Sequence, residues 1–341
     1  MKPAPAPLAK RRLAGRAVAT VKIAASPVGK VRARVVRAGF PYLAPTVPRG
    51  VDVPPEEDTL GANFDTEWAR TWPARAVRRT VIGPPLRLGV RLLANPEIAG
   101  VDRLEDLRRL GDDAPPLIFV PNHHSHVDTP LMVSAVPKPW GDKLFVAAAA
   151  DYFFDKRWKG ALAALSLNAI PIDRETTSRR SADQIRDLID DGWSLVIYGE
   201  GGRSPDGWGQ RFKGGAAYLS SRTAAAVVPV YIDGTGAIYG KGMKRPKPGS
   251  TKVVFGHPLR PLEGESTRRF NTRIEAAVTA LGDEALTDYW PARRRAATRS
   301  NPPLTGPEYT GWRRQWALAE QRTLGKAGLR RRQKRLWPDL D

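Results

Sequence analysis

Residues 117–130 read LIFVPNHHSHVDTP, and this stretch predicts a change from strand to helix. The run begins with four apolar residues, mostly β-branched or aromatic, as in a strand that is buried on both faces. Asp128 and Thr129 then precede Pro130, and proline is favoured in the first turn of a helix. We therefore expect a strand that ends near Pro121, a polar turn, and a helix that begins near Asp128.

The same alternation of short apolar runs with longer helical patterns continues on both sides of this turn. The predicted strands are Leu117–Val120, Leu144–Ala147, Ala169–Ile172, Ser194–Tyr198, Val227–Ile232 and Lys252–Phe255. The predicted helices are Thr129–Val136, Trp158–Leu167, Ser181–Asp191, Gly214–Ala224 and Phe270–Leu286. Strands that alternate with helices predict an α/β fold with a largely parallel sheet flanked by helices.

A helical region is also predicted on the N-terminal side of the sheet. Apolar residues and arginines recur at helical spacing in 65–81 and again in 86–93. Gly83-Pro84-Pro85 lies between the two segments, and such a sequence predicts a break between two helices.

The net charge of +20 is concentrated at the two ends of the chain. Residues 1–40 contain ten Lys or Arg and no acid, and residues 291–341 contain thirteen Lys or Arg against four acids. The middle, 41–290, is nearly neutral, with 32 basic and 31 acidic residues. This pattern predicts flexible basic termini: a Pro- and Ala-rich tail (1–60) that is disordered or lies at a membrane surface, a folded domain (61–290) and a basic C-terminal extension (291–341).

Several classes of protein are disfavoured by what the sequence lacks. There is no cysteine, so disulfides, thiolate metal sites and a cysteine nucleophile are excluded. No apolar run approaches the roughly 18 residues that a membrane-spanning helix needs. The basic N-terminus has no compact apolar segment with a cleavage site, so we do not expect a secretory signal and expect a cytoplasmic location.

His123 and Asp128 are the candidate catalytic residues. They are five positions apart, so on a continuous helix they would point in different directions, and they can meet only across a turn. The strand-to-helix change supplies that turn. A carboxylate on one imidazole nitrogen fixes the tautomer and leaves the other nitrogen to accept a proton, and such a pair can activate a hydroxyl.

Two other interpretations of this segment are open. His124 with His126, or His123 with Asp128, has spacing compatible with zinc, although no metal site is the expected outcome because only His257 lies outside the cluster. Ser125 beside a histidine is a conceivable nucleophile, but the G-x-S-x-G pattern of serine hydrolases is absent.

Four sequence blocks, in order, resemble those of the glycerolipid acyltransferase superfamily. The first is N-H-x-S-x-x-D, which Asn122, His123, Ser125 and Asp128 match. The second resembles G-x-x-x-I-D-R at 168–174, and the third resembles F-P-E-G-T-R-S at 198–204. The fourth is a proline, Pro229, inside an apolar strand. The resemblance covers about residues 95–260, and four ordered blocks are far more specific than one.

The resemblance implies an enzyme of phospholipid biosynthesis, an O-acyltransferase in which His123 is the general base and Asp128 orients it. A fatty acyl group would move from a thioester, acyl-CoA or acyl carrier protein, to the free hydroxyl of a lysophospholipid, most often 1-acylglycerol-3-phosphate. No other cofactor is implied. The implied substrate-binding residues are Ser125, Arg174, Glu200, Gly201, Arg203 and Ser204, and the two arginines suit a phosphate because the guanidinium is a planar fork of donors.

The third block departs from the family pattern at two positions, where Gly199 replaces Pro and Gly202 replaces Thr. A catalytically inactive, lipid-binding relative is therefore an alternative to the enzyme. A second alternative is a nucleic-acid-binding protein whose basic ends grip phosphates, but no nucleic-acid module is present and no nucleic acid is expected as partner. The preferred hypothesis is a peripheral enzyme on the inner face of the cell membrane, held by its basic ends on anionic lipid.

Overall fold

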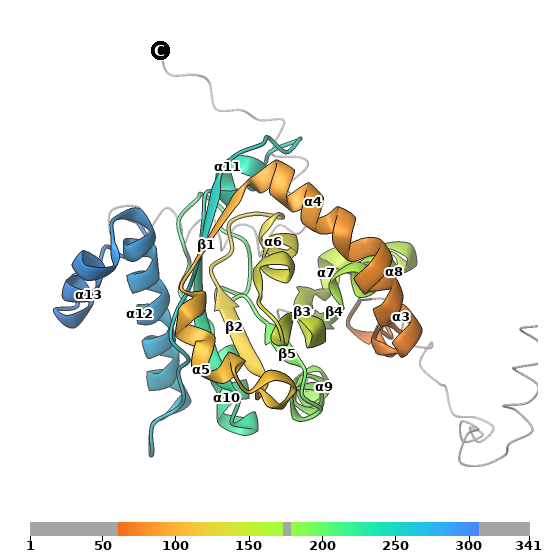
Figure 1. The fold of residues 1–341 in the computed structure, drawn as a ribbon, viewed down its shortest axis with the longest axis horizontal. Coiled ribbons are helices and arrows are strands. Elements are labelled where there is room, and N and C mark those ends of the chain that lie inside the picture. Colours follow the sequence, from red (N-terminus) through yellow and green to blue (C-terminus); the bar gives the residue numbers. More distant parts are fainter. Residues whose placement is uncertain (1–60, 173–178, 307–341) are drawn as a thin grey trace, which may run out of the picture. The chain divides into compact units, whose positions relative to one another are not determined.

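A single sheet organises the part of the chain that the computed structural model describes, which is residues 61–172 and 179–306. In these ranges seven strands are arranged in the order β1-β7-β6-β2-β5-β3-β4 (Figure 1). The strands are β1 (Pro96–Ala99), β2 (Leu117–Pro121), β3 (Leu144–Ala149), β4 (Ala169–Ile172), β5 (Ser194–Val196), β6 (Ala226–Asp233) and β7 (Thr251–Phe255). The α-helices are α3 (Trp72–Val77), α4 (Gly83–Ala94), α5 (Glu105–Arg108), α6 (Asp128–Ala135), α7 (Ala150–Phe153), α8 (Arg157–Leu167), α9 (Arg179–Asp190), α10 (Gly215–Thr223), α11 (Thr235–Tyr239), α12 (Thr267–Leu286) and α13 (Tyr289–Ala297).

The sheet is largely parallel, so the predicted α/β fold is confirmed. Strands β6, β2, β5, β3 and β4 run in one direction. Only the edge is reversed, because β7 pairs antiparallel to β6 and β1 pairs parallel to β7. Parallel strands that are covered on both faces are apolar throughout, and every residue of β2 is buried.

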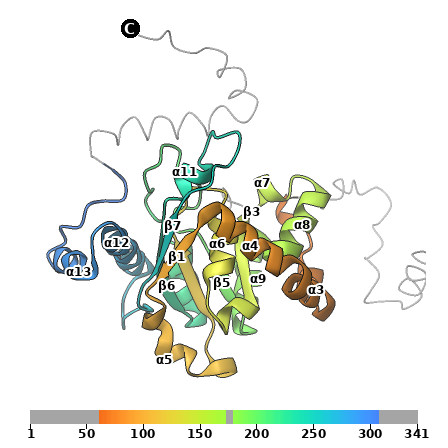
Figure 2. The ribbon, with the colours of Figure 1, turned by 45° about the horizontal axis from the view of Figure 1, so that its top comes forward.

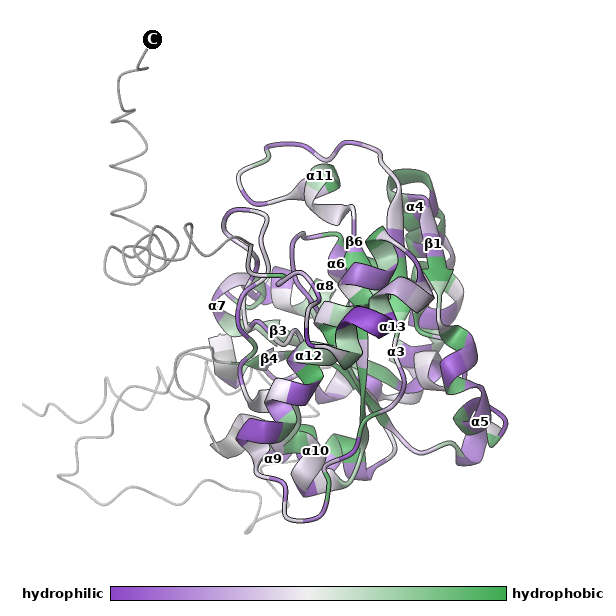
Figure 3. Ribbon diagram, turned by 90° about the vertical axis from the view of Figure 1, so that its left-hand side faces the viewer, coloured by the Kyte–Doolittle hydropathy of each residue, from purple (hydrophilic) through white to green (hydrophobic). Residues whose placement is uncertain are grey.

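Helices cover both faces of the sheet, and successive residues of β2 pack against the helices of alternate faces. Leu117 and Phe119 pack with α4 and α6 on one face. Ile118 and Val120 pack with α9, α10 and α12 on the other. Figure 2 shows α4 and α6 in front of the strands, and Figure 3 shows hydrophobic colours on the strands and a mixture of hydrophilic and hydrophobic colours on the helices. This arrangement leaves the carboxyl ends of the parallel strands exposed at one edge, where binding sites form in such sheets.

The six predicted strands are confirmed, and the structure adds β1. This strand has four residues, begins with Pro96, and lies at the edge of the sheet. A short edge strand that begins with proline carries little of the apolar signal that identifies a central strand.

The predicted break between the two N-terminal helices is wrong. Residues Arg78–Ile82 form a π-helical turn that joins α3 directly to α4, and the Gly83 N–H donates to the Arg78 carbonyl. Pro84 and Pro85 occupy the first turn of α4, where the missing N–H groups of proline cost little. The helical path therefore continues through Gly83-Pro84-Pro85 with a local change in hydrogen bonding.

The predicted start of the C-terminal extension at residue 291 lies inside α13. This helix is tied to α12 by Arg295, whose guanidinium donates to both carboxylate oxygens of Asp283, each at 2.6 Å. The Asn301 amide also donates to Asp283, and the Arg295 side chain lowers the pKa of this carboxyl. Packed structure thus continues past residue 290. The contacts of Arg295 and Asn301 with Asp283 hold α13 on α12, although the composition of this segment is strongly basic.

Other predictions concern residues outside the described ranges. The tail 1–60, residues 307–341 and Arg174 belong to this group. Among the described helices, none combines the length and the apolar composition needed to cross a bilayer.

Candidate active site

The first sequence block forms the turn between β2 and α6, at the carboxyl end of a central strand. Asn122 fixes the strand exit through two bonds to β6. Its amide nitrogen donates to the Ile232 carbonyl at 2.9 Å, and its amide oxygen accepts from the Ile232 N–H at 2.7 Å. Because Asn122 is buried, these bonds also satisfy a side chain that would otherwise be costly to place there.

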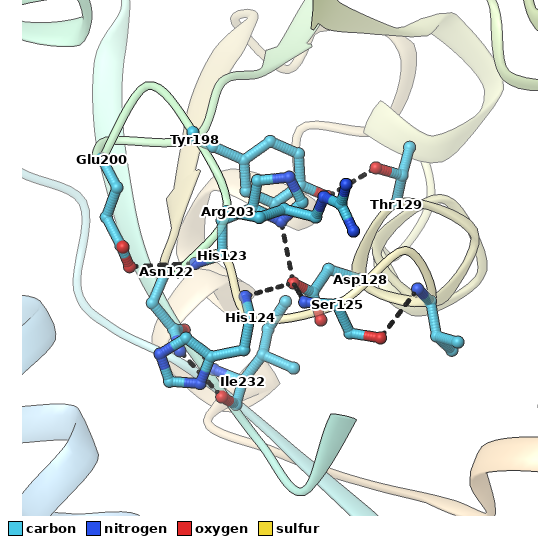
Figure 4. Close-up of polar contacts among 12 residues, drawn as sticks. Asn122, His123, His124, Ser125, Asp128, Thr129, Tyr198, Glu200, Arg203 and Ile232 are labelled. Carbon is cyan, nitrogen blue, oxygen red and sulfur yellow. Dashed lines mark hydrogen bonds and ion pairs between the residues drawn. The ribbon is translucent and has the colours of Figure 1, made fainter. Parts of the chain in front are cut away.

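His123 and Asp128 meet across this turn as the sequence predicts (Figure 4). The distance from His123 Nδ1 to Asp128 Oδ2 is 2.9 Å. The same carboxylate oxygen accepts the backbone N–H groups of His124 at 2.7 Å and Ser125 at 2.8 Å. Asp128 is fully buried as the first residue of α6, so its position is fixed by the turn that it closes. A carboxylate on Nδ1 keeps the proton on that nitrogen and leaves Nε2 as the acceptor.

Tyr198 packs against one face of the His123 ring. The His123 and Tyr198 rings stack with their centroids 3.9 Å apart and an angle of 20° between their planes. The Tyr198 hydroxyl bonds to Thr129 Oγ1 at 2.8 Å. Burial raises the pKa of Tyr198 well above its usual range, so this residue is a neutral phenol that orients the imidazole. Sequence reasoning placed Tyr198 inside a strand and missed this role, whereas Tyr198 lies two residues past the end of β5. The pairing of β5 beside β2 in a parallel sheet was the available signal.

The imidazole opens into a cavity of about 340 Å³ at the carboxyl ends of the strands. Small and apolar residues of β3, β4, α9 and α10 form most of the wall, with His123, Gly201, Gly202 and Arg203 at the polar end. The Arg203 guanidinium carbon lies 5.6 Å from the centre of the Tyr152 ring, which also lines the cavity. In Figure 4 the Arg203 side chain extends beside the rings of His123 and Tyr198. A base and a fixed cation therefore face one apolar cavity.

Three residues that were expected to bind substrate instead brace the site. Glu200 accepts the His123 N–H at 3.0 Å and the Gln210 N–H at 2.9 Å. The Ser204 N–H donates to the His123 carbonyl at 2.8 Å, and the Ser125 hydroxyl donates to the Tyr239 carbonyl at 2.9 Å. The side chains of Glu200, Ser204 and Ser125 are buried and do not line the cavity. Glu200 and Ser204 join the third block to the first, whereas Gly201 and Arg203 reach the cavity.

The neighbouring histidine His126 has aromatic surroundings and does not belong to a metal-binding group among the described residues. His126 lies between Tyr152 and Tyr239, with ring centroids 5.2 Å from each. In the described ranges no group of three His, Asp or Glu side chains is placed to hold a metal ion.

His126 predicts a dependence of stability on pH. Burial, followed by the positive charge of Arg203, lowers the pKa of His126 from 6.5 to about 4. Between these values the unfolded chain binds more protons than the folded chain, so stability rises with pH and is lost as pH falls below 6.5. Lowering pH from 7 to 5 should cost roughly 1 kcal/mol through this residue, after solvent screening halves the ideal value. Urea unfolding of wild type and His126→Gln at both pH values measures this; an equal loss in the two proteins contradicts it.

The replacement of the family's usual proline by Gly199 has a steric reason. A Cβ at this position would come within 2.3 Å of the Phe212 ring, whereas a Cβ at Gly202 would have nothing within 4 Å. Phe212 is buried and packs with the helices of the second layer. The glycine at 199 therefore accompanies an aromatic residue that fills the space beside the loop.

Alanine substitutions at Gly199 and Gly202 should show which of these two glycines the fold requires. Gly199→Ala should destabilise the fold by about 1–3 kcal/mol, since overpacking forces Phe212 to move. Gly202→Ala is the matched control in the same loop and should stay within about 0.5 kcal/mol of wild type. Equal unfolding free energies for the two variants would show that Phe212 does not fix residue 199.

Comparisons with known proteins find similarity over the region that contains this site. A family model described as Acyltransferase matches residues 99–233, which include β2, the histidine turn and the third block. The chain is 27% identical over 160 residues to the chloroplastic 1-acyl-sn-glycerol-3-phosphate acyltransferase LPAT1 of Arabidopsis thaliana, a match that covers 46% of this chain and 43% of that protein. The chain thus spans less than half the length of this curated relative. The crystal structure of the 1-acyl-sn-glycerophosphate acyltransferase PlsC of Thermotoga maritima matches with a TM-score of 0.47 and 22% identity, over 66% of this chain and 84% of that one.

The region that matches the Acyltransferase family model contains the paired His123 and Asp128. Through this region the chain is similar to acyltransferases.

Proposed function

We propose that the protein is an O-acyltransferase that moves a fatty acyl group from a thioester to the free hydroxyl of a lysophospholipid. The observation that carries the proposal is the 2.9 Å contact between His123 Nδ1 and Asp128 Oδ2, in a ring that opens on a cavity shared with Arg203. The base and the cation suit an acceptor that has a hydroxyl and an anionic group close together.

The proposed chemistry is a direct attack with one proton transfer in each direction. His123 Nε2 removes the proton of the acceptor hydroxyl as its oxygen attacks the thioester carbonyl. The new C–O ester bond forms, the C–S bond breaks, and the leaving sulfur takes the proton back from the imidazolium. Asp128 stabilises the transient positive charge on His123, as a carboxylate does in a hydroxyl-activating triad. No acyl group becomes attached to the protein.

The leading acceptor in this proposal is 1-acylglycerol-3-phosphate. Arg203 supports a phosphate because a guanidinium binds phosphate oxygens through two parallel hydrogen bonds. The matched region of the Arabidopsis relative, which is described as acting on this acceptor, supports the same choice. The proposed donor is acyl-CoA or an acyl carrier protein.

A panel of acceptors tests the proposed function. The purified full chain is mixed with one labelled acyl-CoA, or the same acyl group on acyl carrier protein, and with lysophosphatidate, other lysophospholipids or monoacylglycerol. We expect label in phosphatidate, and none with a folded His123→Ala variant. Lysolipid binding with no transfer from either donor would instead support an inactive lipid-binding relative.

We further propose that the enzyme works peripherally at the inner face of the cell membrane, on anionic lipid. The described surface supports this because residues 72–94 contain five arginines and no acid. Large apolar side chains of the same segment are exposed, among them Trp72, Val81, Leu88 and Leu92. Helices with aromatic and aliphatic residues beside arginines bind membrane interfaces. We call the exposed apolar side chains Trp72, Val81, Leu88 and Leu92, with the arginines of residues 72–94, the lipid surface.

Exchange of apolar residues on the lipid surface should weaken membrane binding. The triple variant Val81→Ser, Leu88→Ser, Leu92→Ser should lose most of its sedimentation with phosphatidylglycerol vesicles, since each residue loses apolar burial in the lipid. Leu262→Ser changes an equally exposed leucine outside this surface and is the control. Deleting residues 1–40 measures the share of the basic tail, which should shrink as salt screens it. Unchanged sedimentation of the triple variant would exclude the lipid surface.

A further inference from the structure

A second cavity, which the proposed chemistry does not use, lies between α7 and α8. It has a volume of about 420 Å³. Asp151, Tyr152, Phe153 and Leu167 line both this cavity and the catalytic cavity, so the two spaces share a wall. We call the second cavity the α7–α8 groove. Its remaining wall comes from Asp155 and the inner side of α8.

Three of the polar side chains at the groove already have partners within the protein. The Lys159 ammonium pairs with the Asp155 carboxylate at 3.1 Å. The Ser166 hydroxyl donates to the Leu162 carbonyl of its own helix at 2.6 Å. The surface that is left for a ligand is therefore formed mainly by aliphatic and aromatic groups, with Leu162 at its outer end.

The outer end of the groove continues onto exposed apolar surface of α8. Leu162 is 57% exposed, and Trp158, one turn earlier on the same helix, is 63% exposed. The α8 helix is also joined to the π-helical turn beside α4, because the Arg78 guanidinium donates to the Leu165 carbonyl at 2.7 Å and the Ala164 carbonyl at 3.0 Å. The groove thus runs from the catalytic cavity toward a face that adjoins the lipid surface.

Tyr152 stands at the inner end of the groove, next to the groups proposed for the chemistry. Its ring lies under the Arg203 guanidinium, and its hydroxyl is 3.3 Å from His126 Nε2. A lipid with its phosphate at Arg203 and its hydroxyl at His123 would have its hydrocarbon tail leaving past Tyr152.

This inference rests on the proposed function, because that reaction joins two molecules that each carry an acyl chain. We infer that the α7–α8 groove binds the acyl chain that the lysophospholipid acceptor already carries, whereas the catalytic cavity takes the chain of the thioester. The separation is chemically required, since both chains must approach one carbonyl and one hydroxyl without occupying the same space. The shared wall at Tyr152 and Phe153 keeps the two chains apart.

Filling the groove tests the inference through the acceptor chain length. In Leu162→Trp, KM for 1-oleoyl lysophosphatidate should rise about tenfold, the effect of roughly two methylene groups losing their burial. KM for 1-hexanoyl lysophosphatidate and the preference among acyl-CoA chain lengths should stay as in wild type. Leu262→Trp, at an exposed leucine outside the groove, should leave all three unchanged. A shift in donor preference, an equal rise for both acceptors, or equal effects of the two tryptophans would each overturn the inference.

A binding measurement separates failure of this inference from failure of the proposed function. The chain has no native cysteine, so Leu162→Cys can carry one polarity-sensitive dye. Monomeric 1-oleoyl lysophosphatidate should shift its emission to the blue with saturation, and the same dye at Leu262→Cys should not respond. This result would support the groove even if wild type transferred no acyl group to any acceptor. An absent shift at position 162, with wild type active, would overturn the groove and leave the enzyme proposal intact.

Discussion

His123→Ala should reduce acyl transfer to lysophosphatidate by about a thousandfold, within the range by which a positioned general base accelerates reactions. The His123 imidazole reaches the cavity, and Nε2 is left to accept a proton because Asp128 holds Nδ1 at 2.9 Å. Alanine removes this acceptor and leaves the Asp128 carboxylate bonded to the backbone of His124 and Ser125. The turn should therefore keep its shape. The measurement is kcat/KM at neutral pH with one labelled acyl-CoA.

The neighbouring histidine is the matched control for this variant. His124 lies in the same turn, but in Figure 4 its ring points away from the His123 ring. His124→Ala should keep most of the activity, and both variants should retain wild-type circular dichroism and urea midpoints. Full activity in a folded His123→Ala protein would remove this residue from the mechanism.

Arg203→Ala should lower kcat/KM for lysophosphatidate by about 10–100-fold, the effect of losing a charge-assisted hydrogen bond of roughly 1.5–3 kcal/mol. For monoacylglycerol, which has no phosphate, the loss should be small. The preference for the phosphate-bearing acceptor should therefore shrink. Arg203→Lys should recover only part of it, because an ammonium keeps the charge but lacks the planar fork of donors.

The ratio of kcat/KM for the two acceptors is the informative quantity for Arg203. A purely structural role would lower both values together and leave their ratio unchanged. That result would place the phosphate elsewhere, and Lys213, which also lines the cavity, would be the next residue to test.

The parallel core could be predicted because its strands carry strong local signals. Strand β2 is apolar along its whole length, and so are the first seven residues of β6, as expected where helices cover both faces. The meeting of His123 and Asp128 was also predictable, since a strand exit followed by a helix start leaves few paths for five residues. These features are local in the sequence.

The features that were missed depend on distant contacts. The role of Glu200 as a brace follows from its bond to the His123 N–H, 77 positions away. Gly199 stands out in the sequence only as a departure from the family pattern, whereas the structure packs it against the Phe212 ring. Residue spacing carries no information about which of these side chains turn toward the cavity and which turn away from it.

The helical path through Gly83-Pro84-Pro85 was mispredicted for a different reason. Proline usually marks the end of a helix, but here both prolines stand in the first turn of α4, after a π-helical turn. The sequence shows the prolines, but the bond from the Gly83 N–H to the Arg78 carbonyl that carries the helix past them appears only in three dimensions.

The destination of a labelled acyl group tests the central claim most directly. Wild-type protein is incubated with labelled acyl-CoA, with and without 1-oleoyl lysophosphatidate, and the label is followed in the lipid and on the intact protein. Direct attack by a hydroxyl that His123 has deprotonated predicts label in phosphatidate only when the acceptor is present, and an unmodified protein mass in both reactions. Label on the protein in the absence of acceptor, or no labelled phosphatidate in its presence, would contradict the account.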